Sequence, residues 1–461
     1  MKNIFLPLFL CVYVCFAQAQ ISPTIINACA EGAENRVARL YLEDAITKFR
    51  WKVDEQPINS EGCFQLSVEI PQTQKAFIKI DFYRTYIFLQ PGETYDIIFD
   101  SFDFRIDERI NPHRLTHFLS YRFDEADSNE LNRLIWRFEN MHDHFLIHNY
   151  TESGITREVF EDFRTQIQET FAFSGHAFFI DYKRYALADM ERIFSLTSPA
   201  NLFLNHIQDR PILYNNNAFA DFITGFYAHY FPHQVRYNRN VFVDQINRAN
   251  DLSSLLDSLG RDTTLQNEKL REFVLLLGLR ELWHNPEFRN TSILRLLLDI
   301  ESTTKFYEHS VLANLIIRTL LRFEPGVNTA NFRFSNPQTG ELYDFSESSK
   351  YKYLLFVNSL CESCDAEISI LRSIAENFSD VVDFYVVSCD YEVNRALRSM
   401  PRNLQNITFL HFNRDFQALE SLGIVDYPMA IWLDSENIIQ SFNFQLPSRR
   451  AERAIRQLMS E

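Results

Sequence analysis

Two cysteines three positions apart, Cys361 and Cys364, are the residues whose type and spacing most directly predict chemistry in this chain. They lie in the stretch NSLCESCDAEISILRSIAENF, where an apolar run gives way to a helical pattern. A cysteine just before a helix lies near unpaired amides and the positive end of the helix dipole, which favour the reactive thiolate. We therefore predict that Cys361 is the nucleophile and that Cys364 resolves a mixed disulfide.

Three other chemistries are known for such a pair or for a reactive cysteine in its place. A zinc site needs two further ligands with matching spacing, and this part of the sequence has no second cysteine pair and no His-x3-His motif. A purely structural disulfide would close almost no chain and add little stability. Peroxidase chemistry uses a single activated cysteine in a threonine-containing loop, which NSLCESC does not provide. The sequence therefore predicts a redox dithiol, with no metal and no organic cofactor.

The elements around the pair alternate between strand and helix patterns. A short hairpin with the turn NPQTG precedes them. A helix is predicted at 364–378, and strands are predicted at 353–357, 382–388, 429–433 and 438–444. Such alternation is typical of an α/β sheet with helices on both faces.

These residues carry a resemblance to a known family. The segment Asn331–Glu461 resembles the thioredoxin-like domain of the TlpA/ResA branch, the periplasmic thiol-disulfide oxidoreductases of bacteria. The resemblance rests on NFRFSNPQTGELYDF, on YLLFVNS before the pair, on Glu367, and on VDYPMAIWLDSENIIQSF. It implies that Pro428 is cis and faces the cysteines, and that Glu367 accepts a proton when Cys364 attacks.

The roles that the resemblance implies for Pro428 and Glu367 each have an alternative. Pro428 opens an apparent central strand, where the missing N–H of proline is tolerated, and cis bonds are almost confined to proline. It could instead be an ordinary trans proline at an edge. Glu367 could be a solvated helix residue.

The sequence also departs from the family pattern. Leu360 stands where an aromatic residue is usual, Glu362-Ser363 replaces the usual Gly-Pro or Pro-type insert, and Met429 replaces a common threonine. A carboxylate at Glu362 disfavours a neighbouring thiolate and makes the disulfide harder to reduce. We therefore expect a reductase or isomerase rather than a strong oxidant.

The 461 residues are expected to form several domains. Residues 1–19 read as a signal peptide, because Lys2 precedes a short apolar run that ends at small residues. This predicts a periplasmic or secreted protein, with a lipid anchor as the lesser alternative. Residues 20–110 read as an antiparallel β-sandwich, residues 111–325 as an all-α region, and residues 326–461 as the thioredoxin-like domain.

The first of these regions carries a weaker resemblance. The sequences EGCFQLSVEIP and IFLQPGETYDI resemble the small β-sandwich of unknown function that precedes thioredoxin modules in many envelope proteins of Gram-negative bacteria. This resemblance implies an architecture and no chemistry.

The remaining cysteines and the histidines have simpler interpretations. Without residues 1–19 the chain keeps five cysteines, so at least one thiol stays free or pairs with another molecule. Cys389 ends an apolar strand and is interpreted as a buried thiol, whereas pairing of Cys29 with Cys63 is left open. The histidines of the stretch MHDHFLIH are interpreted as surface or capping residues: His142, His144 and His148.

The net charge of −16 and the lack of a Lys/Arg cluster argue against nucleic-acid binding. The partners predicted for the dithiol are protein thiols and disulfides, with electrons from a membrane donor that the sequence does not identify. The competing interpretation is an envelope binding or scaffold protein that keeps only the shape of the fold.

Overall fold

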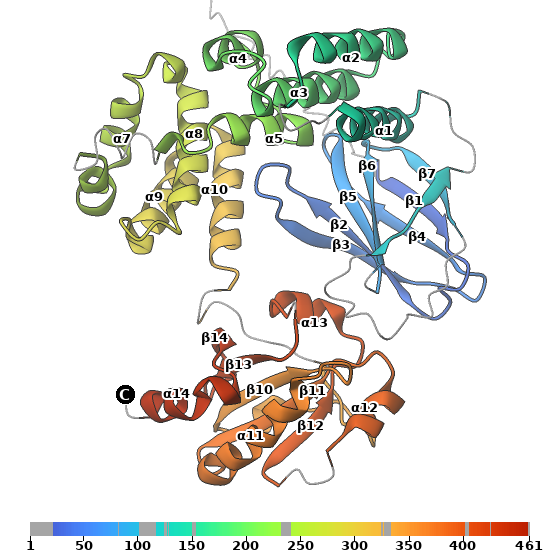
Figure 1. Ribbon diagram of the computed structural model, residues 1–461, viewed down its shortest axis with the longest axis vertical. Helices are drawn as coiled ribbons and strands as arrows, with labels where there is room; N and C mark the ends of the chain where they lie inside the picture. The colour runs from blue at the N-terminus through green and yellow to red at the C-terminus, as the bar shows by residue number, and fades with distance from the viewer. Residues whose placement is uncertain are drawn as a thin grey trace, which may run out of the picture.

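The structure is a computed structural model (Figure 1). It describes residues 22–81, 83–100, 117–123, 127, 129–149, 154–231, 241–323, 326, 333–401, 405–424 and 426–459. The predicted signal peptide and the predicted boundary at residue 110 lie outside the described residues, as does residue 325 at the second boundary. The division into domains therefore stays a prediction.

Two β-sheets are formed by residues 24–123, with strand orders β4-β1-β7-β9 and β3-β2-β5-β6-β8. Successive side chains of a strand point to opposite faces, and one set from each sheet enters a shared hydrophobic cluster. Ile26 and Leu66 of the first sheet and Leu40 and Ile78 of the second are fully buried there. The strands are β1 (Thr24–Cys29), β2 (Val37–Glu43), β3 (Arg50–Pro57), β4 (Cys63–Val68), β5 (Gln74–Ile80), β6 (Tyr83–Leu89), β7 (Thr94–Phe99), β8 (His117–Phe118) and β9 (Tyr121–Phe123).

Most neighbouring strands pair antiparallel, as the predicted antiparallel architecture implies, but two pairs do not. β1 and β7 run parallel, with Ile26 opposite Tyr95, and β6 and β8 are also parallel. Parallel neighbours need a long connection, and the chain between β1 and β7 contains five other strands. β7 can therefore return beside β1 in the same direction. Strands β8 and β9 continue these sheets beyond residue 110.

The following region is helical in the residues that the structure describes between 129 and 323. Several helices begin at residues whose side chains accept a backbone N–H, among them Thr156, Ser198, Asn216 and Asn267. The helices are α1 (Leu131–Asn149), α2 (Arg157–Thr170), α3 (Ala177–Ile193), α4 (Pro199–His206), α5 (Asn217–Phe226), α7 (Leu252–Leu259), α8 (Glu268–Leu282), α9 (Asn290–Thr303) and α10 (Tyr307–Leu320).

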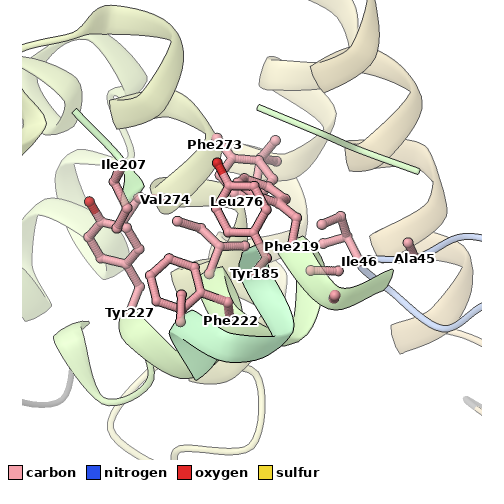
Figure 2. Close-up of a cluster of buried hydrophobic side chains, with 14 of the residues drawn as sticks. Ala45, Ile46, Tyr185, Ile207, Phe219, Phe222, Tyr227, Phe273, Val274 and Leu276 are labelled. Carbon is pink, nitrogen blue, oxygen red and sulfur yellow. The ribbon is translucent and has the colours of Figure 1, made fainter. Parts of the chain in front are cut away.

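The core of the helical region extends into the β-sheets. Ala45 and Ile46, in the connection from β2 to β3, lie in the same cluster as Phe219 and Phe273 (Figure 2). The side chain of Asn132, on α1, accepts the backbone N–H of Phe88 and donates to its backbone oxygen. Phe88 lies on β6 and also belongs to this cluster. The helical region and the β-sheets are therefore joined by apolar packing together with buried hydrogen bonds.

The C-terminal part is a five-stranded sheet in the order β12-β11-β10-β13-β14. The first three strands are parallel, whereas β13 and β14 join antiparallel. The elements predicted at 364–378, 382–388 and 429–433 are confirmed to the residue. The elements are β10 (Tyr351–Val357), α11 (Cys364–Phe378), β11 (Val382–Ser388), α12 (Val393–Ser399), β12 (Ile407–His411), α13 (Phe416–Ser421), β13 (Met429–Leu433), β14 (Ile439–Phe444) and α14 (Ala451–Leu458).

Helices cover both faces of this sheet, as predicted. Residues of α11 and α14 pack in the cluster on one face, and residues of α13 pack in the cluster on the other. The central strand β10 is buried on both sides because its sequence YLLFV is continuously apolar. The Cys-x-x-Cys segment follows this strand and leads into α11.

The C-terminal part lies beside the first β region, with α13 turned towards the β-sheets (Figure 1). Lys79 on β5 pairs with Glu420 on α13 at 2.6 Å. The Arg36 guanidinium donates to the Tyr391 hydroxyl at 2.7 Å, and that hydroxyl donates to Asp81 at 3.0 Å. Arg36 also pairs directly with Asp81.

Candidate active site

Cys361 and Cys364 are joined in a disulfide at the N-terminal end of α11. Cys364 is the first residue of the helix and is 2% exposed, whereas Cys361 lies in the preceding loop and is partly exposed. The backbone N–H of Cys361 donates to Asn358, and that of Cys364 donates to Cys361. Once the disulfide is reduced, Cys361 is the sulfur that another molecule can reach first.

Glu367 lies on the same face of α11 as Cys364, because residues three apart on a helix are neighbours. It is only 6% exposed, so its interpretation as a solvated helix residue is wrong. Its two oxygens accept hydrogen bonds from the backbone N–H of Ser448, at 2.9 Å, and from the Ser448 hydroxyl. The carboxylate thus ties α11 to the segment before α14, and its role as proton acceptor stays a prediction.

Pro428 follows a cis peptide bond with Tyr427, as the sequence analysis expected. Phe356 of β10 pairs with Met429 of β13, so Pro428 lies beside the end of β10 from which the cysteine loop departs. Tyr427 packs against the same hydrophobic cluster as Cys361. The sheet register thus brings the proline segment and the cysteine loop to one edge, although 67 positions separate Cys361 from Pro428.

The sequence analysis missed the polar residues behind the cysteine loop. Asp390, the residue after the apolar stretch VVSC, is 2% exposed and accepts hydrogen bonds from Ser359 and Ser388. The ring Nε2 of buried His411 donates to the backbone oxygen of Asp390 at 2.7 Å. An aspartate two residues beyond a buried strand was the available signal, but its partner 31 positions away could not be read from the sequence.

Cys389 is a free, buried thiol, in agreement with its interpretation from the sequence. It belongs to the cluster on one face of the sheet, whereas Cys364 belongs to the cluster on the other. Burial raises the pKa of the Cys389 thiol far above its usual range, although a hydrogen bond from Tyr427 lowers it. The thiol therefore stays protonated in the folded protein.

The raised pKa of Cys389 predicts a loss of stability at alkaline pH. Above pH 9 the thiol ionises in the unfolded chain but not in the folded one, so its contribution to the free energy of unfolding falls by about 1.4 kcal/mol per pH unit. Urea denaturation at pH 8 and pH 10 should show a smaller alkaline loss for Cys389→Ala than for the unsubstituted protein. Equal losses in the two proteins would contradict this assignment.

Cys29 and Cys63 form a second disulfide, which answers the question that the sequence left open. The two residues lie directly opposite each other in the pairing of β1 with β4. Both are partly exposed. Studies of the Cys361–Cys364 pair therefore need a background in which this disulfide is removed.

The three histidines on α1 lie at or near the surface. The rings of His144 and His148 stack with their centroids 3.9 Å apart, and both residues are exposed. Nδ1 of His148 is 2.8 Å from the backbone oxygen of His144, and His142 lies 3.1 Å from a carboxylate oxygen of its neighbour Asp143. These positions agree with surface and capping roles.

Within the described ranges, the structure has no helix with the length and apolar character needed to cross a membrane. No family model and no curated protein matches the chain. Matches to solved structures cover part of the chain. The thioredoxin domain of a thiol-disulfide oxidoreductase from Bacteroides vulgatus is 19% identical, over 29% of this chain and 96% of that one, with a TM-score of 0.25.

Two further solved structures are similar to the chain. A thiol:disulfide interchange protein from Bacteroides sp. is 19% identical, over 30% of this chain and 93% of that one, with a TM-score of 0.26. A thioredoxin-like protein from Bacteroides caccae is 13% identical, over 50% of this chain and 86% of that one, with a TM-score of 0.31.

Proposed function

We propose that the C-terminal part of this protein, residues 326–461, is a thioredoxin-like domain that exchanges disulfides with other proteins. The observation that carries the proposal is the asymmetric pair at the start of α11, with Cys361 partly exposed and Cys364 buried. An accessible attacking sulfur backed by a shielded resolving sulfur is the arrangement that dithiol exchange requires. The register that brings Pro428 to the same edge adds support.

The exchange proceeds in two balanced steps. The Cys361 thiolate attacks one sulfur of a substrate disulfide, forms a mixed disulfide and releases one substrate thiolate. The Cys364 thiol loses its proton, which Glu367 accepts in this proposal, and attacks the Cys361 sulfur. This releases the second substrate thiolate and forms the Cys361–Cys364 disulfide, so two electrons pass to the substrate. Pro428 shapes the groove that holds the substrate chain.

The direction proposed is reduction or isomerisation of protein disulfides. Glu362 beside Cys361 and Asp365 in the first turn of α11 place negative charge where a thiolate would form. Such charge disfavours the thiolate and stabilises the disulfide. We further propose that the protein is of the TlpA/ResA type and that it is periplasmic or secreted after cleavage of a signal peptide. In this proposal a β-sandwich domain and a helical domain precede the thioredoxin-like domain. Regeneration of the dithiol then requires an electron donor, for which we propose a membrane protein.

The test is a redox titration of the purified protein against a glutathione series, with free thiols trapped and counted by mass. A Cys29→Ala/Cys63→Ala background removes the second disulfide, and Cys361→Ser in that background is the matched control. We expect a two-electron transition more reducing than about −200 mV that is absent in the Cys361→Ser control. A pair that does not exchange at any ratio of glutathione would refute the enzyme and favour the scaffold interpretation.

A further inference from the structure

We propose that Asp390 is a positioning residue for the dithiol: it fixes the loop that leads into Cys361 and places a buried negative charge behind it. The inference rests on the function proposed above. Asp390 lies two residues after the end of β11, and its carboxylate is hydrogen-bonded to Ser359 and Ser388 rather than to a sulfur of the pair. It therefore acts through the loop and through its charge.

The Asp390 carboxylate is bonded to the cysteine loop through two groups of Ser359, its backbone N–H and its hydroxyl. Its Oδ1 accepts the backbone N–H of Ser359 at 3.1 Å and the Ser359 hydroxyl at 2.6 Å. Its Oδ2 accepts the hydroxyl of Ser388, at the end of β11, at 2.8 Å. Ser359 lies two positions before Cys361, so a movement of the carboxylate would be passed to the nucleophile through a very short piece of chain.

Bonds from Asn358 reinforce this attachment. The Asn358 side chain donates to the backbone oxygen of Cys389 at 3.3 Å and accepts the backbone N–H of Leu360 at 3.0 Å. Its backbone oxygen accepts the N–H of Cys361 at 3.0 Å. The residues from Asn358 to Cys361 are thus bonded to the end of β11 and to one another.

The hydrogen-bond donors to the Asp390 carboxylate are uncharged groups. Its carboxylate oxygens are bonded to hydroxyl and amide groups, and no ion pair with Asp390 is found among the residues that the structure describes. Burial lowers the pKa of His411, whose ring is hydrogen-bonded to the backbone oxygen of Asp390, so that ring is neutral at pH 7. A buried carboxylate without a cation keeps a strong field in its surroundings.

The charge of Asp390 acts on two groups near it, the Cys389 thiol and the Tyr427 hydroxyl. Burial raises the pKa values of the Cys389 thiol and the Tyr427 hydroxyl, and the charge of Asp390 raises both further. The negative charge of Asp390 should likewise disfavour a thiolate at Cys361 relative to the thiol. Removal of the charge should therefore stabilise the reduced pair and make the protein a stronger oxidant.

The test compares Asp390→Asn with Asp383→Asn, which removes a carboxylate from the other end of the same strand. Asparagine has the size of aspartate, and its oxygen can still accept both bonds from Ser359. In the background without Cys29 and Cys63, the equilibrium constant with glutathione should shift about tenfold towards the dithiol in Asp390→Asn, which is about 30 mV. The alkylation rate of Cys361 at pH 7 should rise by a similar factor. Asp383→Asn should leave both quantities within about twofold.

Ser359→Ala provides the second variant, which keeps the proposal testable if Asp390→Asn does not fold. It retains the charge and loses the hydroxyl bond, so we expect a slower reaction with oxidised glutathione and an equilibrium constant within about twofold of the unsubstituted value. Equal constants and rates in Asp390→Asn, Ser359→Ala and Asp383→Asn would overturn this inference alone. An unsubstituted pair that never exchanges would overturn the proposed function and this inference together.

Discussion

Cys364→Ser is expected to accumulate a stable mixed disulfide with a disulfide substrate, whereas Cys361→Ser is expected to form almost none. The reason is the difference in burial, because Cys361 is partly exposed and Cys364 is 2% exposed. Without the resolving thiol, the first step of exchange completes and the second cannot occur. With only the buried thiol present, an incoming disulfide cannot reach the sulfur.

The measurement is mass spectrometry of each single-cysteine variant after incubation with oxidised glutathione, in the background without Cys29 and Cys63. The rate of adduct formation should be about a hundredfold higher for the variant that retains Cys361. Cys389 is present in both variants and serves as an internal control, since it is buried in each. Equal rates for the two variants would refute the assignment of Cys361 as nucleophile and Cys364 as resolving residue.

Gly278→Ala is expected to destabilise the helical region. Gly278 lies within α8, and a Cβ atom placed there would be 2.0 Å from two ring carbons of Phe231, which is itself 1% exposed. A buried ring cannot move away from that overlap without shifting its neighbours. Overpacking of this kind costs about 1–3 kcal/mol, and the greater helix propensity of alanine offsets only about 1 kcal/mol.

Gly225→Ala is the matched control for this prediction. Gly225 is also helical, in α5, but its added Cβ would meet the guanidinium end of Arg192, a flexible side chain that can turn aside. Urea denaturation should place the Gly278 variant about 2 kcal/mol below the Gly225 variant in the free energy of unfolding. A Gly278 variant as stable as the Gly225 variant would show that the Phe231 ring is not packed against α8 as described.

The parts of the site that follow from local sequence were predictable. The bounds of α11 follow from the spacing of its apolar residues, and the position of the cysteines follows from those bounds. The contacts that complete the site connect residues distant in sequence: Glu367 bonds to Ser448, and Ser359 bonds to Asp390. A single sequence carries no signal for such pairs, so Glu367 could not be told from a solvated residue and Asp390 was missed.

The same distinction applies to the fold. The alternation of apolar residues predicted several strands of the first β region, among them β4 and β7, because each strand buries one face. The parallel pairing of β1 with β7 depends on which strands become neighbours, and that is decided by tertiary packing. Direction of pairing therefore could not be read from strand patterns alone.

The β-sheets contact the helical region largely through apolar packing, whereas they contact the C-terminal part through charged and polar side chains. Ala45 and Ile46 join the helical core by apolar packing, whereas Lys79–Glu420 and the Arg36–Asp81–Tyr391 contacts join the C-terminal sheet by charge. Salt screens charged contacts and strengthens apolar burial. Rising ionic strength should therefore weaken the attachment of the C-terminal part more than the helical junction, which keeps its apolar packing.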